Sequence, residues 1–161
     1  MIDEIDRNIL AILQDNARTS NAEVARRVGM APSAVFERIR KLEERGVIEE
    51  YAARLEPRAL DRKLLAFVFV RAEEGVGATE TSASLAAIPE VQEVHHVAGE
   101  DCFLVKVRVA DTEALGRLLR ERVGAIPAVR STRTTIVLET VKETMALPVG
   151  SGREELEVAG V

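Results

Sequence analysis

The segment from Ser20 to Gly46 constrains the fold of this chain more than any other stretch. Its apolar residues recur at helical spacing, which predicts two short amphipathic helices. Gly29 ends the first helix, since glycine adopts a left-handed conformation without a side-chain clash, and Pro32 suits the first position of the second. The expected core residues are Val24 and Val28 of the first helix and Val35, Ile39 and Leu42 of the second. Two helices joined by so short a turn are typical of a helix-turn-helix.

The ends of these helices carry further signals. Ser20 and Glu23 match a capping box, in which each side chain accepts the other residue's backbone N–H. The second helix, predicted over residues 32–45, has Ala31 at its N-cap. Alanine offers no side-chain oxygen, at a cost of about 1 kcal/mol relative to Ser or Thr. Residues 3–16 predict a preceding helix, which completes a three-helix N-terminal domain.

Charge is distributed unevenly along the chain. A net charge of −5 argues against a protein that coats nucleic acid without selection. The stretch from position 26 to 41 is nevertheless its most basic, with Arg26, Arg27, Arg38, Arg40 and Lys41 against Glu37 alone. Because the local charge decides contact with phosphate, the sequence remains compatible with selective binding of duplex DNA.

The second helix of the motif is the candidate recognition helix, because the major groove admits one α-helix. The residues predicted to face DNA are Ser33, Glu37, Arg40 and Lys41, with Arg38 at the border. Arg26 and Arg27 are the candidates for phosphate contacts. The competing interpretation is a solvated helix face. Glu37 has two interpretations as well: it accepts from a cytosine amino group, or it pairs with Lys41 four residues on.

The rest of the chain alternates between strand and helix patterns. We expect a short strand or wing over residues 47–55, then strands at 64–72, 91–97, 103–109 and 129–141, with helices over 76–88 and after Asp111. The order β-α-β-β-α-β is the ferredoxin-like arrangement. The sequence therefore predicts an α+β protein: a winged helix-turn-helix in residues 1–55, a linker at 56–63, a ferredoxin-like domain at 64–148 and a flexible tail at 149–161.

The sequence offers little support for metal binding or catalysis. His95 and His96 are adjacent on a predicted strand and therefore point to opposite faces, which is poor geometry for joint metal ligation. Cys102 is the only cysteine, so neither an internal disulfide nor a Cys-rich zinc site is available. We predict no catalytic residues, no metal and no cofactor. The longest apolar run, residues 64–70, is too short to cross a bilayer, and without a recognisable leader we expect a cytoplasmic protein.

These segments together resemble the Lrp/AsnC family, also called feast/famine regulators, over residues 2–148. The resemblance rests on residues 2–10 (IDEIDRNIL), 28–33 (VGMAPS), 37–43 (ERIRKLE), 46–48 (GVI), Gly99 and 132–134 (TRT). It implies a transcription regulator with an N-terminal DNA-binding domain. It also implies that the sheets of the second domain pair into homodimers, which assemble into tetramers or octamers with an amino acid bound between dimers. Two-fold symmetry then requires pseudo-palindromic sites on double-stranded DNA.

The resemblance also implies an effector site at the turn that begins with Gly99. Backbone N–H groups after Gly99 would receive a carboxylate, Glu100 or Asp101 an ammonium group, and the hydroxyls of Thr132 and Thr134 would complete the site. The competing interpretation is a plain β-turn together with strand threonines chosen for their propensity.

Two departures from the family pattern bear on these expectations. Ala31 stands where family members commonly have Ser. The usual Gly-Asp-Tyr-Asp-Tyr run reads Gly-Glu-Asp-Cys-Phe here, so Cys102 replaces an acid and Phe103 a tyrosine. With one fewer charge and one fewer hydroxyl, the site is expected to favour an apolar or small neutral amino acid, because an unpaired cationic side chain would lose hydration there.

Two other functions compete with the regulator. Some enzymes that decarboxylate sirohaem look like the same two-domain fold, and a histidine is a suitable proton donor for them. The cations Arg38, Arg40 and Lys41 beside a formed turn favour DNA binding instead. A stand-alone effector-domain partner of another regulator is disfavoured, because the N-terminal half is present.

Overall fold

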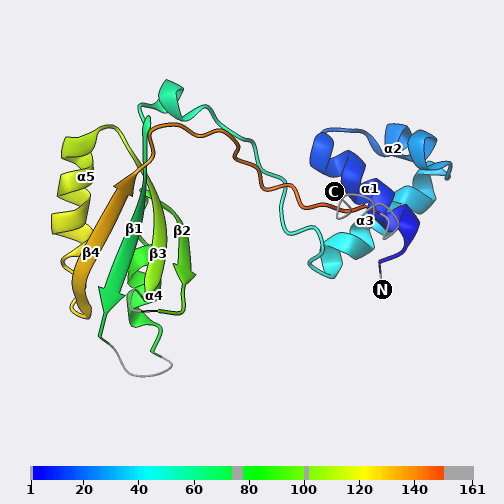
Figure 1. The fold of residues 1–161 in the computed structure, drawn as a ribbon. Coiled ribbons are helices and arrows are strands. Elements are labelled where there is room, and N and C mark those ends of the chain that lie inside the picture. The colour runs from blue at the N-terminus through cyan, green and yellow to red at the C-terminus, as the bar shows by residue number, and fades with distance from the viewer. Residues whose placement is uncertain (1, 74–77, 100–101, 151–161) are drawn as a thin grey trace, which may run out of the picture. The chain divides into compact units, whose positions relative to one another are not determined.

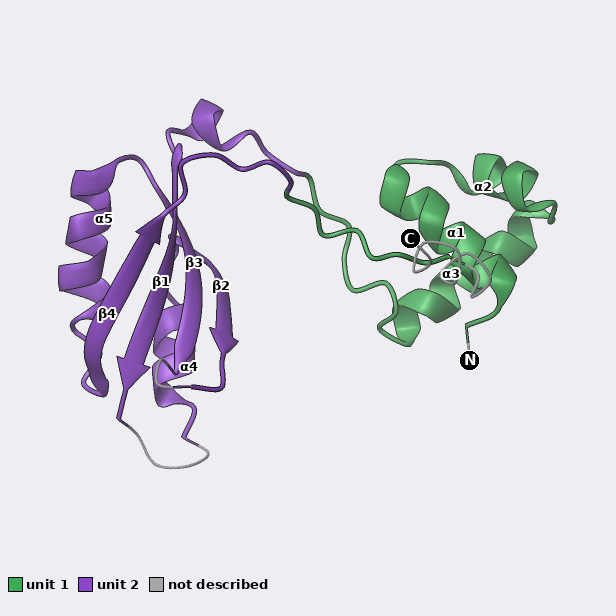
Figure 2. Ribbon diagram, in the orientation of Figure 1, with its two compact units in different colours: residues 1–53, 143–161 green, residues 54–142 purple. Residues whose placement is uncertain are grey.

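The computed structural model describes residues 2–73, 78–99 and 102–150, and the chain forms two compact units. The first comprises Met1–Ala53 with Glu143–Val161, and the second comprises Arg54–Lys142 (Figure 2). Each unit has a hydrophobic core of its own. The chain therefore passes between the units twice, once after Ala53 and once before Glu143.

The first unit contains three helices, α1 (Glu4–Asp15), α2 (Asn21–Val28) and α3 (Pro32–Glu44) (Figure 1). The core between them is formed by Ile9, Val24, Ala25, Val35, Ile39 and Leu42. Gly29 ends α2 with a φ of 70°, in the left-handed region that its position requires. Pro32 is the first residue of α3. The predicted helix-turn-helix is confirmed with nearly the expected limits.

The caps of these helices differ from the prediction in one respect. The Ser20 hydroxyl accepts the Glu23 backbone N–H at 3.3 Å, as a capping box requires. The Glu23 carboxylate makes no return bond to Ser20, because it accepts from Arg26 and Arg27 instead. A complete capping box forms at the start of α1, between Asp3 and Asp6. Ala31 provides no side-chain cap for α3, as expected.

Residues 47–55, all of them described, form no strand, so the predicted strand is wrong. Val47 and Ile48 pack against the core of the first unit, and the chain after them is exposed. A strand needs a hydrogen-bonded neighbour, and none pairs with this segment within the described chain. Pro57–Leu60 follows as a short 3-10 helix, η1.

The second unit consists of β1 (Leu64–Ala72), α4 (Glu80–Ala86), β2 (Val91–His96), β3 (Phe103–Val109), α5 (Thr112–Leu118) and β4 (Val129–Ile136), with a π-helical turn at Leu119–Val123 after α5. The strands form one antiparallel sheet in the order β2-β3-β1-β4. This arrangement confirms the ferredoxin-like β-α-β-β-α-β fold.

Both helices of this unit cover the same face of the sheet (Figure 1). Alternate residues of the two central strands point toward the helices and are buried: Ala66, Val68 and Val70 of β1, and Phe103, Val105 and Val107 of β3. They pack against Leu85 and Ile88, in and just after α4, and against Leu115 and Leu118 of α5. Side chains alternate along a strand, so Phe67, Phe69 and Leu104 lie on the other face, where they remain partly exposed.

Two predicted boundaries are corrected by the structure. The last strand ends at Ile136 rather than 141, since Ile136 pairs with Ala66 and the final ladder bond joins Val137 to Leu65. Beyond that point β1 offers no further partners. The first helix of this unit was predicted from residue 76 and begins at Glu80; residues 74–77 lie outside the described chain.

Candidate nucleic-acid interface

One side of α3 is buried and the other is exposed, as its residue pattern predicts. Val35 and Ile39 face the core, while Ser33, Glu37, Arg40 and Lys41 are exposed on the outward side. Pro32 at the start of α3 helps to orient this side, because it sets where the helix begins. The structure therefore brings together four of the predicted DNA-binding residues on one helix face.

Arg40 occupies the centre of this face and is held by acidic residues. Its guanidinium lies 3.0 Å from the Glu37 carboxylate and also pairs with Glu44. The Glu37 carboxylate, which bonds to the guanidinium, raises the pKa of Arg40. Lys41 is exposed and pairs with no carboxylate in the described chain. The partner of Glu37 is therefore Arg40, three residues on, and not Lys41.

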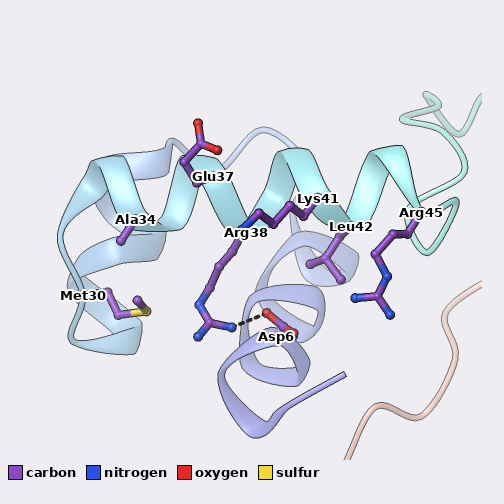
Figure 3. Close-up of a pocket in the computed structure, with 8 residues that line it drawn as sticks. All are labelled: Asp6, Met30, Ala34, Glu37, Arg38, Lys41, Leu42 and Arg45. Atoms are coloured by element: carbon purple, nitrogen blue, oxygen red, sulfur yellow. Dashed lines mark hydrogen bonds and ion pairs between the residues drawn. The ribbon is translucent and has the colours of Figure 1, made fainter. Parts of the chain in front are cut away.

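Arg38 points away from this face. Its Nη1 atom lies 2.7 Å from Asp3 and 2.7 Å from Asp6, and Figure 3 shows it directed at Asp6 while Glu37 leaves the opposite side of the helix. Asp6 is only 7% exposed. Hydrogen bonds to Asp3 and then to Asp6 raise the pKa of Arg38. The pKa of Asp3 is lowered, first by the Asp6 backbone N–H and then by Arg38. Arg38 thus joins α3 to the start of α1.

A concavity of about 360 Å³ lies on the Arg38 side of α3 (Figure 3). Its walls come from α1, the turn and α3: Asp6, Met30, Ala34, Glu37, Arg38, Lys41, Leu42 and Arg45. Lys41 and Arg45 add two exposed cations to this side. Positive charge here suits a phosphate backbone that passes along the edge of the groove.

Arg26 and Arg27 lie in the last turn of α2. Both pair with Glu23, at 2.7 and 2.8 Å. Hydrogen bonds from Arg26 and then from Arg27 lower the pKa of Glu23 to about 2. Both guanidiniums are exposed, so they can exchange this carboxylate for a phosphate.

The structure also exposes an apolar residue that the sequence analysis overlooked. Phe36, on α3, is 52% exposed. It lines a second concavity, of about 290 Å³, on the other side of α3, together with Leu13, Ala17, Thr19, Asn21, Ile39, Arg40, Glu43 and Tyr51. The Tyr51 hydroxyl donates to Glu43 at 2.9 Å. Burial raises the pKa of Tyr51 to about 12, and the hydrogen bond to Glu43 is the next largest cause. Helical spacing could have placed Phe36 on the outward side of α3, because it lies three residues after Ser33 and four before Arg40.

Of the predicted effector residues, the structure describes Gly99, Thr132 and Thr134, and strand β1 lies between Gly99 and the two threonines. Gly99 lies between β2 and β3 with a φ of 136°, and Glu100 and Asp101 lie outside the described residues. Thr132 and Thr134 are on the edge strand β4, paired with Val70 and Val68 on the helix-covered side. Strand β1 separates β3 from β4, a distance of about 10 Å at the usual strand spacing.

The two histidines lie on opposite sides of β2, as expected. His95 pairs with Leu104 and its ring lies 3.1 Å from Glu93, whereas His96 packs on Phe103 with ring centroids 5.2 Å apart. In the described residues, no cluster of three or more His, Cys, Asp or Glu is arranged to hold a metal. No described helix has the length and apolar character needed to span a membrane.

Together the fold and the α3 surface define a class: two-domain DNA-binding proteins with a helix-turn-helix and a ferredoxin-like domain. Comparison with known proteins gives the family. Residues 65–147 match the Lrp/AsnC ligand binding domain and residues 2–49 a winged helix-turn-helix DNA-binding domain. This chain belongs to the Lrp/AsnC family of transcriptional regulators, as its residues suggested.

Curated relatives agree with this assignment. The HTH-type transcriptional regulator FL11 of Pyrococcus horikoshii is 40% identical over 148 residues, covering 92% of this chain and 97% of that protein. The leucine-responsive regulatory protein of Escherichia coli K12 is 40% identical over 150 residues, covering 92% of each. These relatives favour a regulator over the decarboxylase alternative.

Solved structures have the same architecture. A transcriptional regulator of Neisseria meningitidis in complex with L-methionine has a TM-score of 0.86 at 31% identity, covering 92% of this chain and 97% of that one. The feast or famine regulatory protein of M. tuberculosis complexed with L-methionine has a TM-score of 0.84 at 37% identity, covering 91% and 99%.

Proposed function

We propose that this transcriptional regulator contacts DNA through the outward face of α3, which enters the major groove. Ser33, Glu37, Arg40 and Lys41 face the base edges in this proposal. The observation that carries it is the exposure of these four side chains on a helix whose opposite side is fixed in the core. Arg38, predicted as a DNA contact, acts indirectly by holding α3 against α1 through Asp3 and Asp6.

Arg40 exchanges partners when DNA binds. Its exposed ion pairs with Glu37 and Glu44 are of a kind that contributes about 0–1 kcal/mol each, so breaking them costs little. A guanine offers O6 and N7 to an arginine in a bidentate arrangement. Glu37, once released, can accept from the amino group of a cytosine. Arg26 and Arg27 contact phosphates and add affinity without selecting sequence.

The regulator acts as a homodimer that assembles through its sheets. Phe67, Phe69 and Leu104 lie on the face opposite α4 and α5, and an apolar sheet face is stable only when another layer covers it. Two-fold symmetry of the dimer implies pseudo-palindromic sites with half-sites about one helical turn apart or a multiple of it. Further assembly to tetramers or octamers follows the family, and the cytoplasm is the compartment in which we place the protein.

An amino acid is the proposed effector. Two structural neighbours are complexes with L-methionine, and in our proposal backbone N–H groups after Gly99 would receive the carboxylate of such a ligand. Glu100 or Asp101 would hold the ammonium group. Because β1 separates this turn from Thr132 and Thr134, we propose that neighbouring dimers supply the two parts of the site. An apolar or small neutral amino acid remains the expected ligand, given Cys102 in place of an acid.

Binding to the chain's own promoter region at moderate salt tests the DNA contacts, measured by mobility shift with and without an amino-acid mixture. Arg40→Ala should lose discrimination between that region and random DNA. Arg27→Ala should weaken both alike and reduce the salt slope by about one unit. Arg130→Ala, which removes an exposed cation of the second unit, is the control. A protein that binds no fragment better than random DNA would refute the proposal.

A thermal-shift screen of the twenty amino acids tests the effector. A ligand at a hundred times its dissociation constant stabilises the native state by about 2.7 kcal/mol. Asp101→Ala and Thr134→Ala should each abolish the shift of the best ligand, whereas Thr140→Ala, at an exposed position after β4, should retain it. If the best ligand shifts the melting temperature of both site variants as much as that of the wild type, this site is excluded.

A further inference from the structure

Phe36 is an apolar residue within a polar helix face. It lies three positions after Ser33 and four before Arg40, and residues at these spacings are neighbours on one side of a helix. The preceding residue, Val35, is fully buried, whereas Phe36 is 52% exposed. The core of the first unit is formed by other residues of α3, so packing does not explain Phe36.

The surroundings of Phe36 are those of a contact surface. The concavity that it lines has Arg40 on the same helix and Thr19 and Asn21 at the start of α2. It therefore combines a base-reading candidate, hydroxyl and amide groups suited to phosphates, and the half-exposed rings of Phe36 and Tyr51. This surface is continuous with the outward face of α3.

We infer that Phe36 is a specificity-determining residue that reads the C5-methyl group of a thymine in the major groove. The inference rests on the proposed entry of α3 into that groove. Thymine is the only base that presents an apolar group on its major-groove edge, whereas the other bases present hydrogen-bond donors and acceptors. A phenyl ring opposite a polar edge would leave that edge without a partner, so Phe36 favours thymine.

The position of this thymine follows from helix geometry. Phe36 and Arg40 are four residues apart, or about 6 Å along α3, and successive base pairs are about 3.4 Å apart. The methyl group should therefore lie one or two base pairs from the guanine that Arg40 contacts.

Replacing each thymine of a selected site by deoxyuridine tests the inference, because this change removes the methyl group and preserves base pairing. Binding is measured by fluorescence anisotropy. For the wild-type protein, one position in each half-site should weaken binding about fourfold, the factor for burying one methyl group. Phe36→Ala should bind the thymine site more weakly and lose the difference between thymine and deoxyuridine at that position.

Two variants serve as controls. Phe36→Leu keeps an apolar side chain and should retain most of the thymine preference. Tyr51→Phe removes only the hydroxyl that bonds to Glu43 in the same concavity, and should retain all of it. Thermal melts of each variant check folding, which a half-exposed residue should disturb little.

The outcomes separate this inference from the function on which it rests. If the wild-type protein selects a site but Phe36→Ala remains as sensitive to deoxyuridine as the wild type, the inference fails and the DNA-binding function stands. If Phe36→Ala changes the oligomeric state in sedimentation, Phe36 packs against a second copy and the inference is also overturned. A wild-type protein without any selected site refutes both.

Discussion

At the scale of single residues, the two arginines of α3 have different roles although they are only two positions apart. Arg38 satisfies Asp6, which is nearly buried, whereas Arg40 pairs with exposed carboxylates. Arg38→Ala should therefore lower the free energy of unfolding by about 1–3 kcal/mol, because it leaves a buried carboxylate without this partner. Arg40→Ala should lower it by less than about 1 kcal/mol.

Urea denaturation, followed by helical circular dichroism, compares these variants. In DNA binding the order should reverse, with the larger loss of discrimination for Arg40→Ala. Equal destabilisation by the two substitutions would contradict the bracing role of Arg38.

At the scale of elements, the start of α3 lacks a side-chain cap and can be stabilised. Ala31 already has the extended N-cap conformation, with φ −69° and ψ 142°, but makes no side-chain cap bond. Ala31→Ser should stabilise the protein by about 1 kcal/mol, since its hydroxyl can accept a free N–H of the first turn. Ala34→Ser, inside the same helix, should give no such gain. Chemical denaturation measures both, and a neutral or destabilising Ala31→Ser would contradict the cap argument.

A second element, the extended segment from Glu143, belongs to the first unit through an unusual contact. The Gln14 side chain at the end of α1 donates to the Leu147 carbonyl at 2.9 Å and accepts the Leu147 N–H at 2.7 Å. Gln14→Ala should release this segment, so the Leu147 amide should exchange faster with solvent. Asp15→Ala, the next residue of α1, should leave exchange unchanged. Protection of Leu147 that survives Gln14→Ala would show that other contacts hold the segment.

At the scale of the whole molecule, the proposed dimer depends on the sheet face opposite α4 and α5. The Arg133 guanidinium lies 4.0 Å from the centre of the Phe69 ring, and Phe67 and Leu104 are on the same face. Phe69→Asp should yield monomers in sedimentation at micromolar concentration, because it removes an apolar ring from the proposed interface and puts there a carboxylate whose desolvation is costly even beside Arg133. Ser84→Asp, exposed on α4, should remain dimeric. A dimeric Phe69→Asp protein would place the interface elsewhere.

Loss of the dimer should also weaken DNA binding, since a monomer contacts one half-site only. The assembly and the palindrome are therefore tested together. A monomeric variant that binds a full site as tightly as the wild type would contradict their coupling.

The sequence by itself determined the local features of this protein. Gly29 and Pro32 defined the turn, and alternation defined β1 and β3, because left-handed backbone, a fixed φ and a two-residue period are properties of short segments. The same local patterns carried the family resemblance. They also predicted four outward residues of α3, although an exposed phenylalanine among polar neighbours was overlooked.

Only the tertiary structure decided what depends on distant partners. Arg38 pairs with Asp3 and Asp6, 35 and 32 residues away, so its direction could not follow from helical periodicity alone. The last strand ends at Ile136 because β1 has no further partners for it, and residues 47–55 form no strand for the same reason. The strand order, which separates Thr134 from the Gly99 turn, is likewise a property of the assembled sheet. Periodicity specifies which face of an element is buried, but hydrogen-bond partners far along the chain are chosen only when the chain packs.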